Sequence, residues 1–486
     1  MNNEIRVLEP KNVWNKFADL NAVPRPSKHE ERVIAFMLDF GKSLGLETTK
    51  NAVGNVIIRK PASVGMEDRK TVILQSHLDM VHQKNADTDF DFNTQGIEMY
   101  IDGDWVRAKG TTLGADNGLG VATIMALLES RNISHPPLEA LFTIDEETGM
   151  TGAKGLQGGM LKGDILLNLD TEEDDEIDIG CAGGIDVTAK GMYREVPLRE
   201  GFVAYKIGVK GLLGGHSGMD IHKGLGNANK IMNTLLILGQ EQLGLRIVQI
   251  DGGGLRNAIP RESTAWVAIK ASDSDKWDGL FKDWTHSLKK EFLATEPNLQ
   301  MVCEAAHLPK MVMDTHDQLA FTDAVKNAHN GVYNMSATMK DLVETSNNMA
   351  RVEVGNGQIN IACLTRSSLE EGKMELAKEL KDNFEKSGYE VILSGDYPGW
   401  NPNPDSAILE LLRIKYIALF NEQPRVVACH AGLECGILGK NYPGVDMISF
   451  GPTIKGAHSP DERASISSLQ KFWKFILEIL KAIPKK

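Results

Sequence analysis

The sequence has no uninterrupted apolar stretch of about 18 residues or more, which is the length that a membrane-spanning helix needs. Its N-terminus, "MNNEIRVLEPKNVWNKF", lacks the basic start and apolar core of a secretory signal. Lysine and arginine form no cluster, and the formal net charge is −13. Because nucleic acids and anionic membranes both attract positive surfaces, we expect neither as a partner.

Cysteine is also scarce, with five residues in a chain of 486. The number is odd, and no pair has the C-x-x-C spacing of a thiolate metal site or a redox motif. This pattern is typical of reduced thiols, and it predicts a cytoplasmic location. The cysteines are Cys181, Cys303, Cys363, Cys429 and Cys435.

Apolar residues, by contrast, make up 42% of the chain, which is more material than one core usually holds. Short apolar runs such as "TVILQSHLD", "PLEALFTI", "DILLNLD" and "VDMISF" alternate with helical patterns such as "DNGLGVATIMALLESR". The alternation predicts an α/β domain with a mostly parallel central sheet flanked by helices. Near the N-terminus, residues 11–47 have a helical pattern, in which Ser27 and Glu30 are placed to form a capping box.

The middle of the chain has a different pattern. Segments such as "FVAYKIGVKG" and "STAWVAIKAS" alternate apolar and polar residues, and helical patterns separate them. One polar face per strand favours an antiparallel sheet backed by helices. We therefore predict an inserted α+β lid domain at 186–395, between two parts of the catalytic domain at 1–185 and 396–486.

Polar side chains follow the predicted strands of the catalytic domain. Because ligands bind at the carboxyl ends of the strands in an open α/β sheet, we expect these side chains to meet in one place. They are His77 and Asp79 after "TVILQS", Asp145, Glu146 and Glu147 after "LFTI", Asp170 after "LLNL", His458 after "MISFGPTIKGA", and Asp116 in a glycine-rich loop.

The chemistry of this set indicates a metal centre. Two histidines with several carboxylates and no cysteine suit zinc, or manganese or cobalt, better than they suit a thiolate-rich structural site. Adjacent carboxylates such as Glu146 and Glu147 repel each other unless a proton, a cation or water separates them. The number of acids is sufficient for a site with two metal ions.

Longer motifs resemble a known family. "SHLDMV", "GTTLGADNGLG", "TIDEETGMTGA", "LNLDTEE", "CAGGIDV", "GGHSGMDI", "LRNAIPRE", "HAGLECG" and "GPTIKGAHSPDE" are together similar to the dinuclear zinc peptidases of family M20, over essentially the whole chain. The resemblance implies two Zn²⁺ ions, for which Co²⁺ or Mn²⁺ could substitute. Asp116 would bridge them, with His77 and Asp170 completing one site and Glu147 and His458 the other.

The same resemblance implies the remaining roles. Glu146 would be the general base and then the general acid for a hydroxide that bridges the metals, and Asp79 would hold the His77 ring. The other implied residues are His216 as oxyanion donor, Asn257 and Arg366 as ligands of the substrate backbone and its C-terminal carboxylate, and Gly432 and Glu434 as residues lining the pocket.

The expected function is therefore that of a dipeptidase for unblocked dipeptides, including Xaa-His and β-alanyl-histidine. Two alternatives stay open: another M20-type amidohydrolase, of the aminoacylase or carboxypeptidase kind, and a metal- or peptide-binding protein without turnover. The "GGHSGMD" segment does not fit the G-x-S-x-G elbow of serine hydrolases. The oligomeric state also stays open, and a homodimer through the lid domain is one arrangement consistent with an inserted domain.

Overall fold

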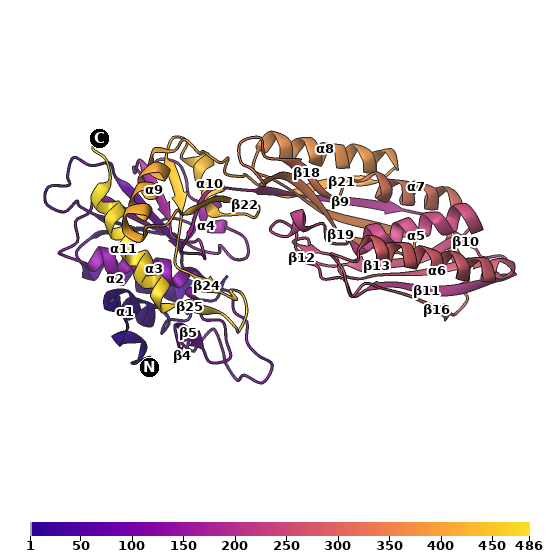
Figure 1. The fold of residues 1–486 in the computed structure, drawn as a ribbon, viewed down its shortest axis with the longest axis horizontal. Helices are drawn as coiled ribbons and strands as arrows, with labels where there is room; N and C mark the ends of the chain where they lie inside the picture. The colour runs from indigo at the N-terminus through magenta and orange to yellow at the C-terminus, as the bar shows by residue number, and fades with distance from the viewer. Residues whose placement is uncertain (1) are drawn as a thin grey trace. The chain divides into compact units, whose positions relative to one another are not determined.

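The computed structural model describes residues 2–486, which form two compact units (Figure 1). The chain passes between the units four times, and the short segment Cys429–Gly432 belongs to the second unit although its flanking residues belong to the first. The sequence analysis placed that segment in the catalytic domain. The first unit comprises Met1–Gly180, Pro402–Ala428 and Leu433–Lys486, and the second comprises Cys181–Asn401 and Cys429–Gly432.

The first unit is built on an eight-stranded sheet with the order β1-β2-β6-β3-β7-β23-β8-β22. The four strands β6, β3, β7 and β23 run parallel, as predicted, whereas β1, β2 and β8 pair antiparallel with their neighbours. Every residue of β3, β6 and β7 is buried, which explains why most of these residues are apolar. The strands are β1 (Glu47–Lys50), β2 (Val56–Lys60), β3 (Val72–His77), β6 (Leu138–Thr143), β7 (Ile165–Asn168), β8 (Glu176–Cys181), β22 (Arg425–Cys429) and β23 (Asp446–Ser449).

Helices cover this sheet. The α3 helix packs on β3 and on α1, and α9 packs on β23 and α11. Thirteen of the fifteen residues of α3 are buried, so this helix is apolar around most of its circumference. The helices are η1 (Ile5–Val7), α1 (Lys11–Leu20), α2 (Glu31–Ser43), α3 (Ala115–Glu129), α4 (Thr151–Lys154), α9 (Ala407–Phe420), α10 (Glu434–Asn441) and α11 (Ile466–Ala482).

The predicted helix over residues 11–47 was wrong in its extent. It is split into α1 and α2, and the segment between them forms no capping box. The Ser27 hydroxyl instead donates to the Asp79 carboxylate at 2.8 Å, and the Glu30 carboxylate accepts from the Lys28 backbone nitrogen at 2.9 Å. A long-range partner for Ser27 therefore takes the place of the local cap.

A smaller sheet carries the loop that contains His458. It has the order β24-β25-β5-β4 and is antiparallel throughout. The pairing of β24 with β25 closes the loop, so that residues 456–462 form the turn between them. The strands are β4 (Met99–Asp102), β5 (Trp105–Ala108), β24 (Ile454–Lys455) and β25 (Arg463–Ser465).

The second unit is an α+β domain with a nine-stranded antiparallel sheet. Its order is β16-β11-β15-β13-β19-β20-β9-β21, and β18 pairs with β19 off this path. The strands are β9 (Gly183–Met192), β11 (Phe202–Lys210), β13 (Arg246–Gly253), β15 (Ser263–Lys270), β16 (Gln300–Ala306), β18 (Gly331–Met335), β19 (Val343–Gly355), β20 (Gln358–Ser367) and β21 (Glu390–Tyr397), with the short pairs β10 (Glu195–Pro197) and β17 (Met311–Met313), and β12 (Gly215–His216) and β14 (Ala258–Ile259).

Four long helices pack with this sheet around one continuous apolar core. Trp277 of α6 and Leu235 of α5 are both fully buried in that core. The helices are α5 (Ala228–Leu243), α6 (Ser274–Glu291), α7 (Thr315–Asn327) and α8 (Glu370–Lys386), with the short turns η2 (Ile221–Lys223) and η3 (Ala271–Asp273).

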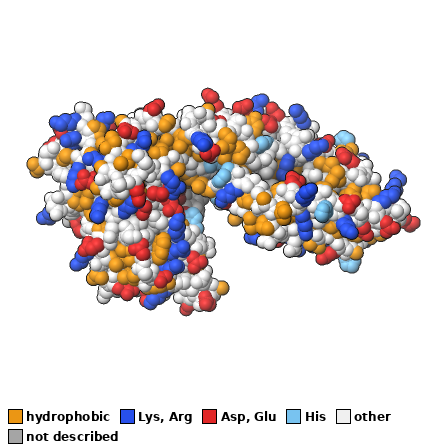
Figure 2. Space-filling view, viewed as in Figure 1, with side chains coloured by type: hydrophobic (Ala, Val, Ile, Leu, Met, Phe, Trp, Pro, Cys, Tyr) orange, Lys and Arg blue, Asp and Glu red, His pale blue; other side chains and the backbone are white. Residues whose placement is uncertain are grey.

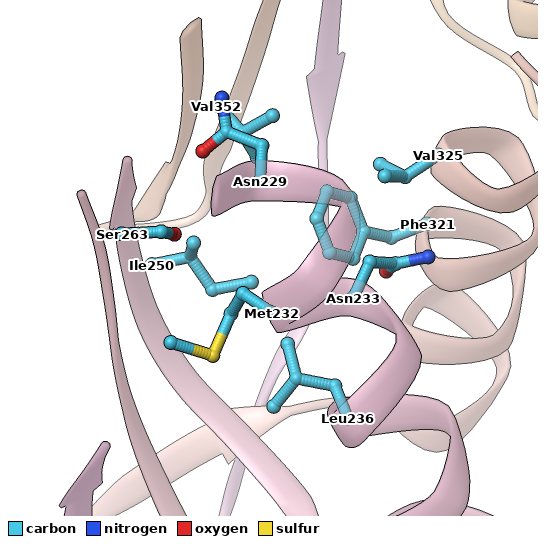
Figure 3. Close-up of a pocket in the computed structure, with 9 residues that line it drawn as sticks. All are labelled: Asn229, Met232, Asn233, Leu236, Ile250, Ser263, Phe321, Val325 and Val352. Atoms are coloured by element: carbon cyan, nitrogen blue, oxygen red, sulfur yellow. The ribbon is translucent and has the colours of Figure 1, made fainter. Parts of the chain in front are cut away.

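A cavity of about 10 Å³ lies inside this core, beside α5 (Figure 3). That is roughly the space of one water molecule, so the cavity is far too small for a peptide. It is lined by Asn229, Met232, Asn233, Leu236, Ile250, Ser263, Phe321, Val325 and Val352.

Acidic and basic side chains are interspersed on the face of each unit that Figure 2 shows. Among the helices of residues 2–486, none combines the length and the apolar character that crossing a bilayer requires.

Candidate active site

Three neighbouring parallel strands of the first unit deliver polar side chains to one edge of the sheet. The strand β3 ends at His77, β6 ends two residues before Asp145, and β7 ends two residues before Asp170. Since β6, β3 and β7 are adjacent and parallel, their carboxyl ends lie side by side. The sheet alone therefore brings together the residues that the sequence analysis selected after these strands.

Asp116 and His458 reach the same place from two loops. Asp116 lies in the first turn of α3, where its backbone departs from helical geometry, with φ −79° and ψ 111°. His458 lies in the turn between β24 and β25 and has a left-handed backbone, with φ 65°. The His458 Nε2 atom is 3.2 Å from Asp116 Oδ2 and 3.1 Å from Glu147 Oε2. On its other side, Asp116 Oδ1 is 3.1 Å from His77 Nε2.

The carboxylate of Asp116 is thus shared by two groups of potential metal ligands. In one group its ligand atom lies within 4.8 Å of those of His77 and Asp170, and in the other within 4.8 Å of those of Glu147 and His458. The donors are imidazole nitrogens and carboxylate oxygens, which suit zinc and similar divalent ions. Glu147 Oε1 is buried and has no hydrogen-bond partner among residues 2–486. These residues therefore fit a pair of divalent cations.

Crowding of the charges shifts the protonation of the cluster. Burial raises the pKa of Asp170 to about 8, and burial together with the Asp116 charge raises the pKa of Glu147. Hydrogen bonds to Asp116 and Glu147 raise the pKa of His458 to about 11. For Asp116, burial favours a higher pKa, but hydrogen bonds to the two imidazoles outweigh it and the pKa is lowered.

Glu146 lies beside the shared group. Its carboxylate has a ligand atom within 4.8 Å of those of His77 and Glu147. Burial raises the pKa of Glu146 well above its usual value, and the charges of Asp170, Glu147 and Glu434 add to the rise. Glu146 is therefore a buried carboxyl group that holds a proton more readily than an exposed one, which suits a general acid and base.

Asp79 connects the metal-ligand cluster to its support. Its carboxylate is fully buried, with Oδ1 3.4 Å from His77 Nδ1. It also accepts hydrogen bonds from the backbone nitrogens of Glu146 and Glu147, at 3.1 and 3.3 Å, and from the Ser27 hydroxyl. Asp79 thus holds the loop after β6 through its carboxylate, and its backbone carbonyl oxygen lies 3.2 Å from His77 Nδ1.

Two buried charged residues that the sequence analysis missed support the Asp116 loop. Glu462 accepts hydrogen bonds from four consecutive backbone nitrogens at the start of α3, those of residues 113–116, at 2.7 to 3.2 Å. Arg25 donates to the carbonyl oxygens of Leu78 at 3.1 Å, Asp79 at 3.2 Å and Gly114 at 2.5 Å. Glu462 follows His458 by four residues in "HSPDE", which was the available signal; Arg25 gave none.

Glu434, which the sequence analysis expected to line the pocket, is a buried residue at the start of α10. Its side chain is fully buried, and it accepts hydrogen bonds from Gln75 Nε2 at 2.7 Å and Thr143 Oγ1 at 2.6 Å. Burial raises its pKa to about 7. The structure thus places Glu434 behind the strand ends of β3 and β6 rather than on an open surface.

The other predicted site residues belong to the second unit. His216 lies in β12, where its Nδ1 accepts hydrogen bonds from the backbone nitrogens of Gly218 at 3.2 Å and Met219 at 3.0 Å. An Nδ1 that accepts carries no hydrogen, so a neutral His216 ring bears its hydrogen on Nε2. Asn257 precedes β14, the partner of β12, and its carbonyl oxygen accepts from the Ser217 nitrogen at 2.8 Å.

Arg366, in β20, is also close to this ribbon. Its Nε donates to the Ser217 hydroxyl at 3.3 Å.

Gly432 ends the segment 429–432. The sequence analysis did not name His430, in the same segment, as a site residue. The His430 ring hydrogen-bonds Ser346 Oγ at 2.8 Å, and burial, together with the charge of Arg366, lowers its pKa to about 3. His430 is therefore a neutral imidazole near a cation.

Comparison with known proteins decides the family. The model of peptidase family M20/M25/M40 matches residues 73–482. The chain belongs to peptidase family M20. As a member of this M20 peptidase family it is a hydrolase, and the expectation drawn from its motifs is confirmed.

Relatives of this M20 peptidase match it over nearly their whole length. It is 44% identical to the cytosol non-specific dipeptidase of Escherichia coli (strain K12), over 99% of this chain and 100% of the relative. The crystal structure of an aminoacylhistidine dipeptidase from Vibrio alginolyticus matches with a TM-score of 0.92 and 44% identity, covering 100% of this chain and 99% of the other. A tripeptidase from Staphylococcus aureus shares the fold at 16% identity and a TM-score of 0.57, with 98% and 99% of the chains covered. The predicted α/β fold with an inserted domain is thereby confirmed.

Proposed function

We propose that this protein is a metal-dependent dipeptidase that holds two divalent ions, with zinc as the expected metal, and cleaves unblocked dipeptides, including Xaa-His and β-alanyl-histidine. The observation that carries the proposal is the position of Asp116, whose two oxygens each face a different histidine at 3.1 and 3.2 Å. Two relatives at 44% identity are named as dipeptidases, and one of these names specifies aminoacylhistidine.

The metal ions would be held by five residues. His77 and Asp170 would complete one site, Glu147 and His458 the other, and Asp116 would belong to both. Bound divalent ions acidify water and polarise a carbonyl group, which is the chemistry that peptide hydrolysis needs. Asp79 would keep the His77 ring in place, because the second nitrogen of a ligating imidazole needs a partner.

Glu146 would move the proton. As a carboxylate it would accept the proton of the attacking water, and its burial, which raises its pKa, favours holding that proton. It then donates the proton to the leaving amine. The same group therefore serves as base and acid in one turnover.

Residues of the second unit would bind the substrate. His216 bears its hydrogen on Nε2 when neutral, so it can donate to the oxyanion that forms at the scissile carbonyl. Arg366 would bind the free C-terminal carboxylate, since a guanidinium can contact both of its oxygens. Asn257 would hold the substrate backbone, and Gly432 would line the pocket.

Two further points are part of the proposal. A cytoplasmic location is supported by the E. coli relative, which is named a cytosol dipeptidase. A homodimer through the inserted domain stays a prediction.

A substrate panel tests the proposal. The purified protein, stripped with a chelator and reloaded with zinc, manganese or cobalt, is assayed on β-alanyl-histidine, on other unblocked dipeptides and on N-acetyl amino acids. We expect hydrolysis of the dipeptides that depends on added metal, with about two ions bound per chain. Cleavage of N-acetyl amino acids alone would favour the aminoacylase alternative and overturn the dipeptidase.

The Glu146→Gln variant separates catalysis from binding. It keeps the shape of the side chain, and none of the five proposed metal ligands is changed. We expect it to bind as much metal as the wild type and to lose about 10²- to 10⁴-fold in kcat. A full rate in this variant would exclude Glu146 as the base, and the absence of turnover in the wild type would favour the binding-protein alternative.

A further inference from the structure

Two adjacent glycines occupy the start of β9, in the motif "CAGGIDV". The strand β9 lies between β20 and β21, so Gly184 has Arg366 opposite it on one side and Tyr397 opposite it on the other. A Cβ atom at Gly184 would lie 2.7 Å from Tyr397 Cε1 and Oη. At Gly183 it would lie 2.5 Å from the Tyr397 carbonyl oxygen. Any side chain at Gly183 or Gly184 would therefore collide with Tyr397.

The ring of Tyr397 uses this room to cross the strand. Because Gly184 has no side chain, the ring lies over its backbone and the hydroxyl oxygen accepts a hydrogen bond from Arg366 Nη1 at 2.9 Å. Arg366 is therefore held by a residue that is two strands away in the sheet. Burial raises the pKa of Tyr397, which keeps the hydroxyl neutral.

A buried lysine fixes the backbone of Tyr397. Lys373 has no exposed surface, and its Nζ donates to the Tyr397 carbonyl oxygen at 2.9 Å. The same Nζ forms ion pairs with Asp396 at 2.6 Å and Glu370 at 2.8 Å. A buried ammonium is costly unless it is paired in this way, so its partners hold the end of β21 firmly on α8.

Arg366 is held at two points of its guanidinium group. Nε donates to Ser217 and Nη1 to Tyr397, and no residue between 2 and 486 hydrogen-bonds Nη2. Two of the five guanidinium N–H groups are thus used to set the plane of the fork. The remaining N–H groups of Arg366 then point in a fixed direction and can donate to a ligand.

We propose that Tyr397 is a positioning residue that orients Arg366 across Gly184 and thereby sets the preference of the enzyme for a free C-terminal carboxylate. The inference rests on the proposed function, in which Arg366 binds that carboxylate. A fork held in one plane loses little freedom when it meets a planar carboxylate, whereas an amide in the same place has no charge to offer.

The Tyr397→Phe variant removes the hydroxyl and keeps the ring over Gly184. We expect KM for an unblocked dipeptide to rise about tenfold, as for the loss of a hydrogen bond to a charged group, with kcat within about twofold of the wild type. Hydrolysis of the matching dipeptide amide should not change, because it lacks the carboxylate. In an Arg366→Lys background the Tyr397→Phe change should have no further effect.

Tyr389→Phe is the matched control. Tyr389 precedes β21, packs over Gly191 of the same strand β9, and its buried hydroxyl has no hydrogen-bond partner in residues 2–486. Gly191 is seven residues from Gly184, or roughly 23 Å along an extended strand. This variant should leave KM and the preference for the carboxylate unchanged. An equal change in both variants would show a general packing effect and would overturn the proposal.

Nuclear magnetic resonance of arginine-labelled, metal-free protein tests whether Tyr397 orients Arg366, and it does so without an activity assay. In the wild type the Arg366 guanidinium should rotate slowly and give separate Nη signals, which should average in Tyr397→Phe. Identical Arg366 signals in the two proteins would overturn the positioning role. If the wild type cleaves no dipeptide, the proposed function fails, and the spectra still show whether Tyr397 orients Arg366.

Discussion

The Glu462 carboxylate accepts a hydrogen bond from the backbone nitrogen of Asp116 at 3.2 Å. Its two oxygens also accept from the three preceding nitrogens, at 2.7 to 2.9 Å, so a single buried side chain satisfies the donors at the start of α3. Because Glu462 follows the His458 turn, it joins the two loops that carry the proposed shared ligand and one of its partners.

Replacing Glu462 should weaken metal binding without touching a proposed ligand. Glu462→Gln removes the charge and turns one of the two acceptor oxygens into a donor that faces backbone N–H groups. We expect a 10- to 100-fold loss of metal affinity, the usual range for residues that support ligands, measured by competition with a chromogenic chelator. Glu98→Gln, which changes an exposed carboxylate, is the control. Equal affinities for the wild type and Glu462→Gln would contradict the supporting role.

The metal-free protein should lose stability as the pH rises from about 6 to 8. The pKa of Asp170 is raised to about 8 and that of His458 to about 11, and both groups therefore bind more protons in the folded than in the unfolded state over this interval. Their stabilising protons are fully present at low pH and are released as the pH approaches the folded pKa. We expect the melting temperature to fall by about 5 °C.

Scanning calorimetry of the chelated protein at pH 6 and pH 8 measures this change. Asp170→Asn, which cannot ionise, should show a smaller difference between the two pH values. Reloading with a divalent cation should remove most of the difference in the wild type, because cations then replace the protons. A metal-free protein that is more stable at pH 8 would reverse the predicted sign.

Glu434 should tune the pH dependence of catalysis through its charge. The charge of Glu434 is one of the causes that raise the pKa of Glu146. Glu434→Gln keeps an acceptor for Gln75 and Thr143 and removes that charge, so the pKa of Glu146 should fall. Since Glu146 must be ionised to accept a proton, the acidic limb of the kcat/KM profile should move to lower pH. An unshifted limb would argue against this coupling, with Glu410→Gln, which changes an exposed side chain of α9, as the control.

A destabilising substitution in the core of the second unit should leave metal binding by the first unit unchanged. Trp277 is fully buried in the second unit, between Tyr205 and Phe281. Trp277→Ala should destabilise that unit by about 3–5 kcal/mol, while the metal content of the protein should stay unchanged because every proposed ligand lies in the first unit. Leu293→Ala, at a largely exposed position, should change stability by less than about 0.5 kcal/mol. Loss of metal in Trp277→Ala would show that the units are coupled.

The parts of the site that the sequence predicted are those set by local pattern. Short, mainly apolar runs identify β3, β6 and β7 as buried strands, and a polar residue just after such a strand lies at the edge of the sheet. The two loop residues, Asp116 and His458, follow from glycine-rich or proline-containing turns near predicted elements. The same pattern also selected Asp79, Asp145 and Glu146, so the choice of five residues as metal ligands came from the resemblance to family M20.

The supporting residues could not be predicted because their partners are distant in the chain. Ser27 has the local pattern of a helix cap, yet its hydroxyl binds Asp79, 52 residues away. Arg25 and Glu462 bind backbone atoms of distant segments, and only Glu462, four residues after His458, had a sequence signal in its position. That Glu434 lines the pocket stays a prediction; its hydrogen bonds to Gln75 and Thr143 depend on how α10 packs, which no local pattern specifies.

The entry of β23 into the middle of the first sheet, between β7 and β8, constrains how the molecule can be made. Residues 446–449 and His458 emerge late in synthesis, after the whole Cys181–Asn401 segment has left the ribosome. Since domains generally fold as units during translation, the second unit can build most of its core first, while the earlier half of the first sheet waits for its missing strand. Until β23 is made, the strands β1, β2, β6, β3 and β7 form a sheet whose edge at β7 is unpaired.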